Sequence, residues 1–82
     1  MYSVYILQCA DGTYYTGIAL DAEARYLKHN SGLGAKYTRG RRPVRLIYRE
    51  DGYTRGEALR REREIKKLSR AEKNYLANLR KP

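Results

Sequence analysis

Near its N-terminus the chain has two short runs of β-branched and aromatic residues, separated by Asp11 and Gly12, in the sequence SVYILQCADGTYYTG. Runs of this composition favour strands, and an Asp-Gly pair between them is a strong hairpin signal. We therefore expect antiparallel strands near residues 3–9 and 13–19.

The register of this hairpin decides where two tyrosines lie. A two-residue turn would place Tyr5 and Tyr15 on opposite faces of the sheet. A three-residue loop that ends on a left-handed Gly12, as in a G1 bulge, would pair Cys9 with Thr13 and place both tyrosines on one face. The local residues alone favour neither register strongly.

The remaining elements follow from caps and patterning. We expect a helix over residues 21–31, with Asp21 as its N-cap, and a third strand over 44–50. Two capping boxes, Thr54 with Glu57 and Ser69 with Glu72, begin two more helices, the first ending near Leu68.

Residues 32–43 have the composition of a basic loop punctuated by glycines. Eighty-two residues suffice for one small domain, so we expect residues 1–82 to form a single unit. The expected fold is α+β: a three-stranded antiparallel sheet flanked by three helices, in the order β-β-α-β-α-α.

The charge is strongly unbalanced, because 18 Lys and Arg oppose 9 Asp and Glu and give a formal net charge of +9. Such a chain suits a polyanionic partner, most commonly nucleic acid, although a generally basic surface would have the same composition. No apolar run approaches the roughly 18 residues that span a membrane. With a single cysteine, which excludes an intrachain disulfide, the chain is expected to reside in the cytoplasm.

Some charged residues stand where packing would favour other types. On the expected helix over 54–68, Glu62 points along the apolar stripe that contains Ala58 and Ile65. An inward carboxylate is costly unless cations or donors meet it, so an ion pair with an arginine is the structural alternative to a functional role. Arg25 and His29 are one turn apart, and a solvated helix face would explain them equally simply.

Taken together, these residues resemble the GIY-YIG nuclease superfamily. The resemblance rests on SVY at 3–5, YTG at 15–17, Arg25, HNSGLGAKYT at 29–38 and EALRREREIKKLSRAEK at 57–73. The pattern is most similar to the small stand-alone UPF0213 branch, and also resembles the nuclease domain of the bacterial excision-repair protein UvrC and that of the SLX family. Ser3 replaces the leading glycine of the first motif, and Thr16 the isoleucine of the second.

The resemblance implies a metal-dependent endonuclease that hydrolyses DNA with low sequence specificity, in repair or processing. It implies these site residues: Tyr5, Tyr15, Arg25 and His29 as catalytic; Glu62 as ligand of one Mg²⁺ or Mn²⁺; Asn74 as a further active-site residue; and Lys36 as a phosphate contact. From their charge, Lys36, Arg39, Arg41 and Arg42 of the basic loop and the basic residues of the helix over 54–68 are expected to follow a nucleic-acid backbone. The expected partner is nucleic acid, DNA above all, with no membrane association.

The implied chemistry selects between the hairpin registers. A free phenol has a pKa near 10, so Tyr5 could take a proton from water only with help, and His29 is the one relay of near-neutral pKa. A one-metal site also needs both phenols over one patch, which favours the bulged hairpin. Two other functions stay open: a non-catalytic nucleic-acid-binding module, and an adaptor for an acidic protein.

Overall fold

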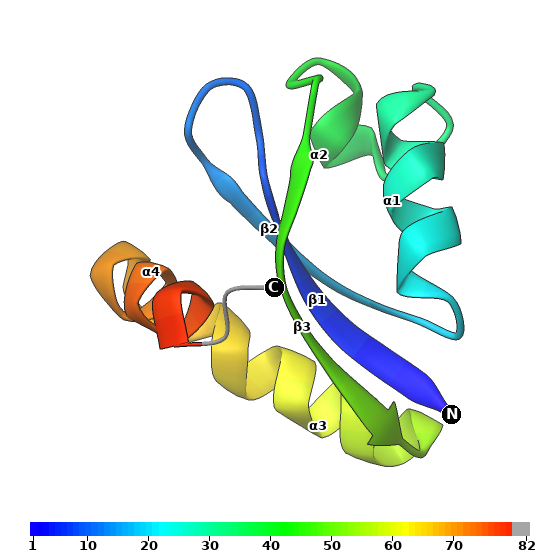
Figure 1. Ribbon diagram of the computed structural model, residues 1–82, viewed down its shortest axis with the longest axis vertical. Helices are drawn as coiled ribbons and strands as arrows, with labels where there is room; N and C mark the ends of the chain where they lie inside the picture. The colour runs from blue at the N-terminus through cyan, green and yellow to red at the C-terminus, as the bar shows by residue number, and fades with distance from the viewer. Residues whose placement is uncertain (80–82) are drawn as a thin grey trace.

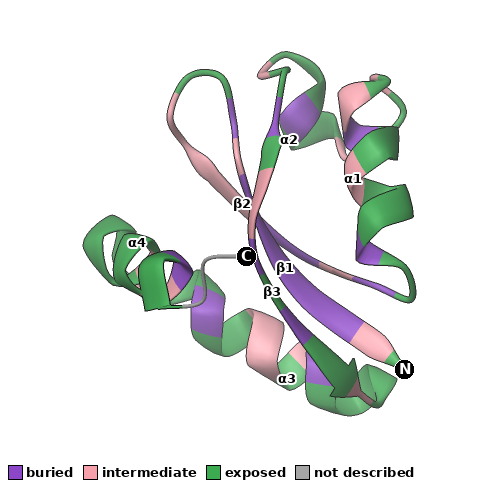
Figure 2. Ribbon diagram, viewed as in Figure 1, coloured by how far each residue is buried: buried purple, intermediate pink, exposed green. Residues whose placement is uncertain are grey.

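The centre of the fold is a three-stranded antiparallel sheet with the strand order β2-β1-β3. A computed structural model describes residues 1–79 of the chain. The first strand, β1 (Tyr2–Gln8), pairs on one side with β2 (Tyr14–Ala19) and on the other with β3 (Arg45–Tyr53). Because β1 is central, most of its side chains are buried, whereas β2 and β3 are the two edge strands (Figure 2).

Within residues 1–79, four helices cover this sheet, two on each side (Figure 1). They are α1 (Ala22–Asn30), α2 (Lys36–Arg39), α3 (Arg55–Lys66) and α4 (Arg70–Leu79). The expected α+β class and antiparallel sheet are confirmed, and the strand expected over 44–50 continues to Tyr53. The expectation of a plain loop over 32–43 was wrong, because α2 forms within it.

The hairpin has the bulged register. The backbone N–H of Cys9 donates to the carbonyl of Thr13 over 2.8 Å, and Gly12 has a φ of 84°. The loop therefore has three residues and uses glycine in the left-handed region, where other residues are strained. Tyr5 and Tyr15 consequently belong to the same side of the sheet, and the expectation based on the implied chemistry is confirmed.

Local hydrogen bonds set the ends of the helices as the sequence indicates. Asp21 caps α1 by accepting from Ala24 N over 3.1 Å. Both expected capping boxes are present, Thr54 with Glu57 at the start of α3 and Ser69 with Glu72 before α4. At the other end of α1, Gly32 adopts a φ of 85° and its N–H bonds the His29 carbonyl over 3.2 Å, which turns the chain back across the end of the helix.

The two faces of the sheet carry separate apolar clusters. The cluster under α1 contains these buried residues: Tyr5, Leu7, Cys9, Ala19, Ala22 and Val44. The cluster under α3 and α4 contains these: Val4, Ile6, Tyr48, Ala58, Ile65 and Ala77. Alternation along β1 supplies both clusters, since successive side chains of a strand point to opposite faces. In the described part of the chain, no helix is long and apolar enough to cross a membrane.

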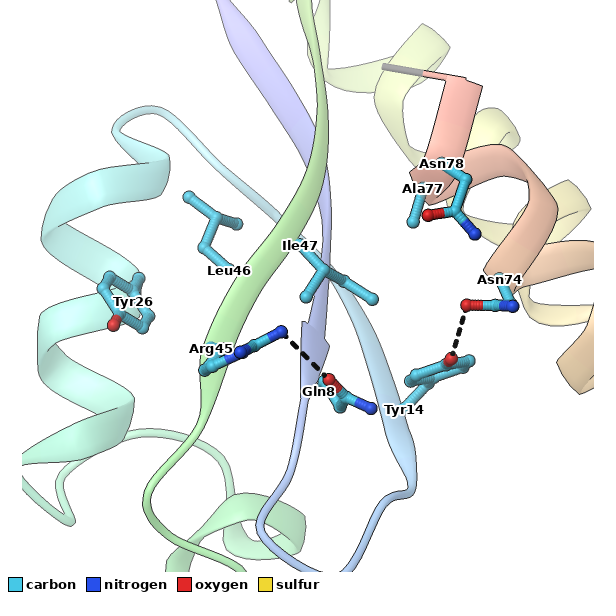
Figure 3. Close-up of a pocket in the computed structure, with 9 residues that line it drawn as sticks. All are labelled: Gln8, Tyr14, Tyr26, Arg45, Leu46, Ile47, Asn74, Ala77 and Asn78. Atoms are coloured by element: carbon cyan, nitrogen blue, oxygen red, sulfur yellow. Dashed lines mark hydrogen bonds between the residues drawn. The ribbon is translucent and has the colours of Figure 1, made fainter. Parts of the chain in front are cut away.

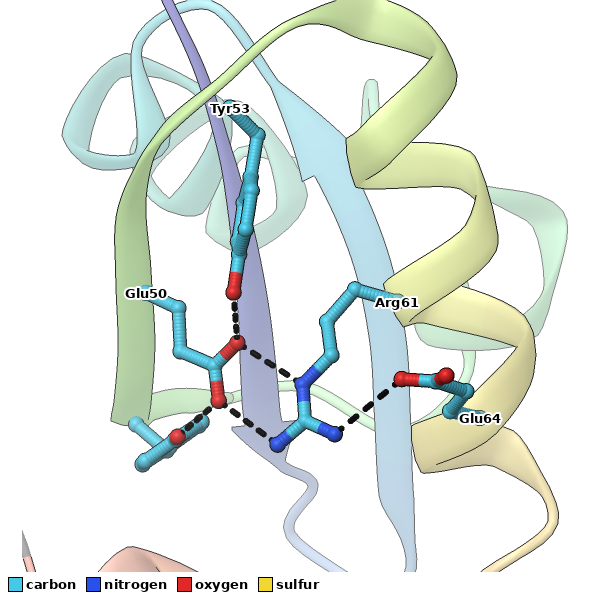
Figure 4. Close-up of polar contacts among 5 residues, drawn as sticks. Glu50, Tyr53, Arg61 and Glu64 are labelled. Carbon is cyan, nitrogen blue, oxygen red and sulfur yellow. Dashed lines mark hydrogen bonds and ion pairs between the residues drawn. The ribbon is translucent and has the colours of Figure 1, made fainter.

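A buried carboxylate fixes α3 against β3 (Figure 4). Glu50 is 7% exposed and accepts from Arg61 Nε over 2.8 Å and from Arg61 Nη2 over 2.9 Å. The hydroxyls of Tyr53, at 2.6 Å, and of Tyr48 also donate to it. Burial raises the pKa of Glu50, but these hydrogen bonds outweigh burial and hold the pKa at about 2.

Candidate active site

Tyr5 extends from the central strand across β2, where Gly17 leaves space for it. The two residues are opposite each other in the antiparallel pair. A Cβ at residue 17 would lie 2.6 Å from the Tyr5 hydroxyl oxygen and 3.2 Å from Cε2 of Tyr15. Any side chain larger than hydrogen would therefore displace one of the phenol rings. Glycine at this position brings the hydroxyl of a central-strand tyrosine to the edge strand.

His29 meets this hydroxyl from α1. The Tyr5 oxygen is 3.1 Å from Nε2 of His29, and Nδ1 of His29 is 2.8 Å from Oγ1 of Thr38 on α2. The Thr38 hydroxyl donates its hydrogen to the carbonyl of Ala35 over 2.9 Å, so it accepts from His29 Nδ1–H. The backbone N of Ala35 lies 3.4 Å from Nδ1, and a hydrogen bond from it would require the tautomer with its proton on Nε2. The shorter contact with Thr38 favours the tautomer with its proton on Nδ1. Nε2 is then an acceptor for the Tyr5 hydroxyl.

Both members of this pair are held in their neutral forms. Burial and, after it, the positive charge of Arg25 lower the pKa of His29 below 6.5. Burial raises the pKa of Tyr5 well above its usual 10, and Tyr15 and Glu62 add to this rise. A neutral phenol therefore donates to a neutral imidazole across the physiological pH range. Tyr5 can act as a base only while it passes its own proton to His29.

Tyr15 joins the pair to a partly exposed aromatic surface. Its ring centroid lies 6.5 Å from that of Tyr5, 5.2 Å from that of His29 and 5.9 Å from that of Tyr37 on α2. The guanidinium carbon of Arg41 lies 4.0 Å above the Tyr37 ring. The contacts fix the position of the Tyr15 ring, and burial raises the pKa of its phenol.

Two opposite charges flank the phenols from the two helical layers. Arg25 on α1 is exposed, and its charge favours the ionised forms of Tyr5 and Tyr15, whereas the charge of Glu62 on α3 opposes them. The side chain of Glu62 is 17% exposed, and Nζ of Lys66 lies 3.6 Å from its Oε2. The alternative of a Glu62–arginine pair is thus wrong, since the arginine of α3 that pairs with a buried carboxylate is Arg61, which binds Glu50.

The geometry is compatible with a metal held by one carboxylate. No group of three or more His, Cys, Asp or Glu side chains converges anywhere in residues 1–79, so an all-protein cage is absent from that part of the chain. Glu62 is the carboxylate that acts on both phenols, and it is partly accessible. A hard cation that keeps most of its waters, as Mg²⁺ does, needs little more from the protein.

The basic residues expected to bind nucleic acid differ in whether their side chains already form hydrogen bonds within the protein. Lys36 and Arg39 on α2 are exposed. Arg41 donates to Asp11 over 3.0 Å and to the carbonyl of Tyr37 over 2.8 Å. Arg42 donates to the carbonyl of Arg39 over 3.0 Å. The last two arginines therefore hold the loop together as well as adding charge to it.

Asn74 lies apart from the other expected site residues. It is on α4, and its Oδ1 accepts from the Tyr14 hydroxyl over 3.4 Å. Tyr14 packs with the cluster under α3 and α4, on the face opposite Tyr5 and Tyr15. Figure 3 shows Asn74 and Tyr14 at a pocket of about 430 Å³, which Gln8 and Asn78 also line. The contacts of the described residues do not join Asn74 to Tyr5, Tyr15 or His29.

Two residues that shape the site were not singled out by sequence reasoning. Thr38 selects the tautomer of His29, and a Cβ at Gly34 would overlap the imidazole. Both belong to the stretch that follows α1, where nothing in the residue types reveals a contact with His29. The turn at Gly32 was the available signal, because it predicts that the chain reverses over the end of α1.

Comparison with known proteins shows the family to which this chain is related. Residues 1–75 match the GIY-YIG catalytic domain. A UPF0213 protein of Halobacterium salinarum is 54% identical over 76 residues, which are 93% of this chain and 99% of that protein. A UPF0213 protein of Staphylococcus saprophyticus is 57% identical over 70 residues, 85% of each chain.

A solved structure shares the fold. The solution NMR structure of a UPF0213 protein from Bacillus halodurans is 49% identical, with a TM-score of 0.62, and the match covers 99% of this chain and 87% of that one. The protein EF2693 from E. faecalis, also solved by NMR, is 41% identical with a TM-score of 0.59, over 95% and 84% of the two chains. The chain described here therefore belongs to the GIY-YIG domain family, in its UPF0213 branch.

Proposed function

We propose that the protein is a divalent-metal-dependent endonuclease that hydrolyses phosphodiester bonds of DNA with low sequence specificity, in repair or processing. The observation that supports this most is the hydrogen bond between Tyr5 and a neutral His29, with Arg25 and Glu62 acting on the same phenol. A hydrogen bond between Tyr5 and His29 that served only to stabilise the fold would not need the charges of Arg25 and Glu62 beside it. The family match to a nuclease-type domain agrees with this function.

The proton path uses the pair as a relay. As water attacks phosphorus, the bond from phosphorus to the leaving ester oxygen breaks, and the leaving oxygen takes a proton from bulk water. At the same time one proton of the attacking water moves to the Tyr5 oxygen while the Tyr5 hydroxyl proton moves to Nε2 of His29. The imidazole becomes an imidazolium, which keeps its Nδ1–H bond to Thr38. The neutral imidazole is available as acceptor because its pKa is lowered, and the phenol never has to exist as a free phenolate.

Charge on the phosphate is met by the flanking residues. Arg25 presents a permanent, forked cation that suits a phosphoryl oxygen pair. Glu62 would hold one Mg²⁺ or Mn²⁺, which when bound supplies Lewis-acid stabilisation of the transition-state charge. Tyr15, packed against His29 with a neutral phenol, would orient the attacking water or the phosphate by a hydrogen bond.

One observation favours a second candidate function. Tyr5 is 1% exposed, and its hydroxyl already has a partner in His29, as in a purely structural hydrogen bond. A non-catalytic nucleic-acid-binding module with the same fold would keep this pair for packing alone. Such a module would bind DNA in a salt-sensitive manner and would not cut it.

The test is a cleavage assay on linear, branched and single-stranded DNA and on RNA, with Mg²⁺, Mn²⁺ or EDTA. We expect cleavage with the metals and none in EDTA, lost in Arg25→Ala and kept in Arg60→Ala, which changes an exposed arginine of α3. Salt-sensitive binding without cleavage would select the non-catalytic module. No binding to any nucleic acid would select the adaptor for an acidic protein.

A further inference from the structure

The cations of this protein differ in whether their donors are already used. Arg41, Arg42 and Arg61 bond to acceptors within the fold. Arg25 and Lys28 on α1 and Arg55 at the start of α3 form no hydrogen bond or ion pair with the described residues, and all three are exposed. Cations with free donors can bind an external anion without breaking internal contacts, so they are the better candidates for phosphate contacts.

These three free cations line one groove. It has a volume of about 450 Å³, and Tyr2, Ile18 and Leu20 contribute apolar surface to it. The start of α3, the N-terminal end of β1 and the loop from β2 to α1 lie at the same end of the molecule (Figure 1). Asp21 also lines the groove, but its carboxylate caps α1 through Ala24 N. Arg25, whose charge acts on Tyr5 and Tyr15, also lines this groove.

We propose that this groove binds the sugar-phosphate backbone of the DNA strand beside the scissile phosphate, with Lys28 and Arg55 as the phosphate contacts. The proposal rests on the proposed function in one respect, that Arg25 binds the scissile phosphate. Phosphates need cations with free donors, and the apolar surface suits the sugar and base between them. The groove is large enough for a nucleotide unit.

This placement adds α1 to the expected contacts, which were the basic loop from Lys36 to Arg42 and the basic residues of the helix over 54–68. In that loop the donors of Arg41 and Arg42 are occupied by Asp11 and by backbone carbonyls. Binding phosphate through Arg41 or Arg42 would therefore compete with bonds that hold the loop together, whereas Lys36 and Arg39 are exposed and can add to the contacts of the groove. The strand would run from Arg25 along α1 towards the first turn of α3.

The test measures equilibrium binding in EDTA, so it does not depend on cleavage. Lys28→Gln, Arg55→Gln and the double variant are titrated with fluorescein-labelled duplex and single-stranded DNA by anisotropy, from about 50 to 200 mM salt. Arg60→Gln is the matched control, because Arg60 is exposed on the same helix as Arg55 but outside the groove. Thermal melts should be unchanged, since neither Lys28 nor Arg55 has an internal bond to lose.

We expect each groove variant to weaken binding roughly threefold to tenfold and to reduce the log–log salt slope on duplex DNA by about 0.9. Arg60→Gln should change affinity by less than about twofold. Unaltered affinity and slope in the double variant would overturn the groove. Equal binding of a polyglutamate of matched charge, with the same dependence on Lys28 and Arg55, would overturn it in favour of an acidic protein partner.

Cleavage and binding measured together distinguish a failure of the proposed endonuclease activity from a failure of the proposed groove. If no substrate is cut with Mg²⁺ but the groove variants still lose DNA affinity, the groove stands and the endonuclease does not. If DNA is cut with metal but the groove variants bind as wild type, the endonuclease stands and the groove does not.

Discussion

The hydroxyl oxygen of Tyr5 lies 3.1 Å from Nε2 of His29, a residue 24 positions further along the chain. The bond joins the central strand of the sheet to α1 and is buried at both ends. Because Thr38 fixes the imidazole from its other nitrogen, the direction of the bond runs from phenol to imidazole. This direction determines the first two predictions.

Removal of the Tyr5 hydroxyl should affect chemistry more than stability. We expect Tyr5→Phe to lower the cleavage rate about 10²–10⁴-fold, since it removes the proton relay. The free energy of unfolding should fall by about 1–3 kcal/mol, because Nε2 of His29 loses its buried partner. Single-turnover cleavage and urea unfolding measure the two effects. Tyr26→Phe, which changes a half-buried tyrosine of α1, is the control. Wild-type cleavage by Tyr5→Phe would reject the relay.

The lowered pKa of His29 predicts a pH dependence of stability. Between its lowered folded pKa and 6.5, the unfolded chain binds a proton that the folded chain does not. The free energy of unfolding should therefore fall as the pH drops below 6.5, and His29→Gln should lose this part of the slope. Urea unfolding between about pH 5 and pH 8 measures it. The stabilisation by Glu50 is lost mainly between pH 4.5 and about 2 and is present in both proteins, so the difference in slope between wild type and His29→Gln isolates His29. A slope unchanged in His29→Gln would contradict the prediction.

Glu62→Gln should abolish cleavage while leaving the fold and most DNA binding intact. The contact that it weakens is a 3.6 Å pair with Lys66, whose side chain is 55% exposed, so the loss of stability should stay below about 0.5 kcal/mol. The pKa values of Tyr5 and Tyr15 should fall, since Glu62 raises both. Thermal melts with and without Mg²⁺ and a cleavage assay separate the effects, with Glu64→Gln as control. Cleavage at the wild-type rate, or early melting in EDTA, would count against a metal role.

Gly17→Ala tests whether the position of the Tyr5 hydroxyl matters. The new methyl group would lie 2.6 Å from that oxygen, so the ring has to move away from its bond to His29. A displacement of this size can cost about 10²-fold in rate, and the overpacking about 1–3 kcal/mol in stability. Gly40→Ala is the control, because a Cβ at Gly40 meets open space. Full activity of Gly17→Ala would show that the hydroxyl need not be held there.

Features that depend on neighbours in the sequence could be predicted from it. Each capping box needs two residues three positions apart. The hairpin itself was expected from its Asp-Gly pair, but its local residues favoured neither register, and the chemistry implied by the resemblance selected the loop with a left-handed Gly12. The position of Glu62 on the inner side of α3 followed from helical spacing. Apart from the register, these are contacts within a few residues, so composition and spacing determine them.

Contacts between distant segments could not be predicted in this way. Helix α2 has four residues and no apolar periodicity, and its Thr38 is buried against His29 of another helix. The burial of Glu50 depends on Arg61, Tyr48 and Tyr53 meeting at one point. Strand alternation places Glu50 on the same side as Tyr48, which was the available signal, but a charged residue near the end of a strand usually faces solvent.

The bond between Glu50 and Arg61 has a rotational consequence for α3. Successive side chains of an α-helix point in directions that differ by about 100° around the helix axis. When one side chain is held in place, the direction of the next side chain is therefore fixed as well. Arg61 is held by two bonds to a buried carboxylate, and Glu62 is its neighbour. The bidentate bond therefore opposes rotation of the helix about its axis, and it keeps the Glu62 side chain mostly buried, where its charge acts on Tyr5 and Tyr15.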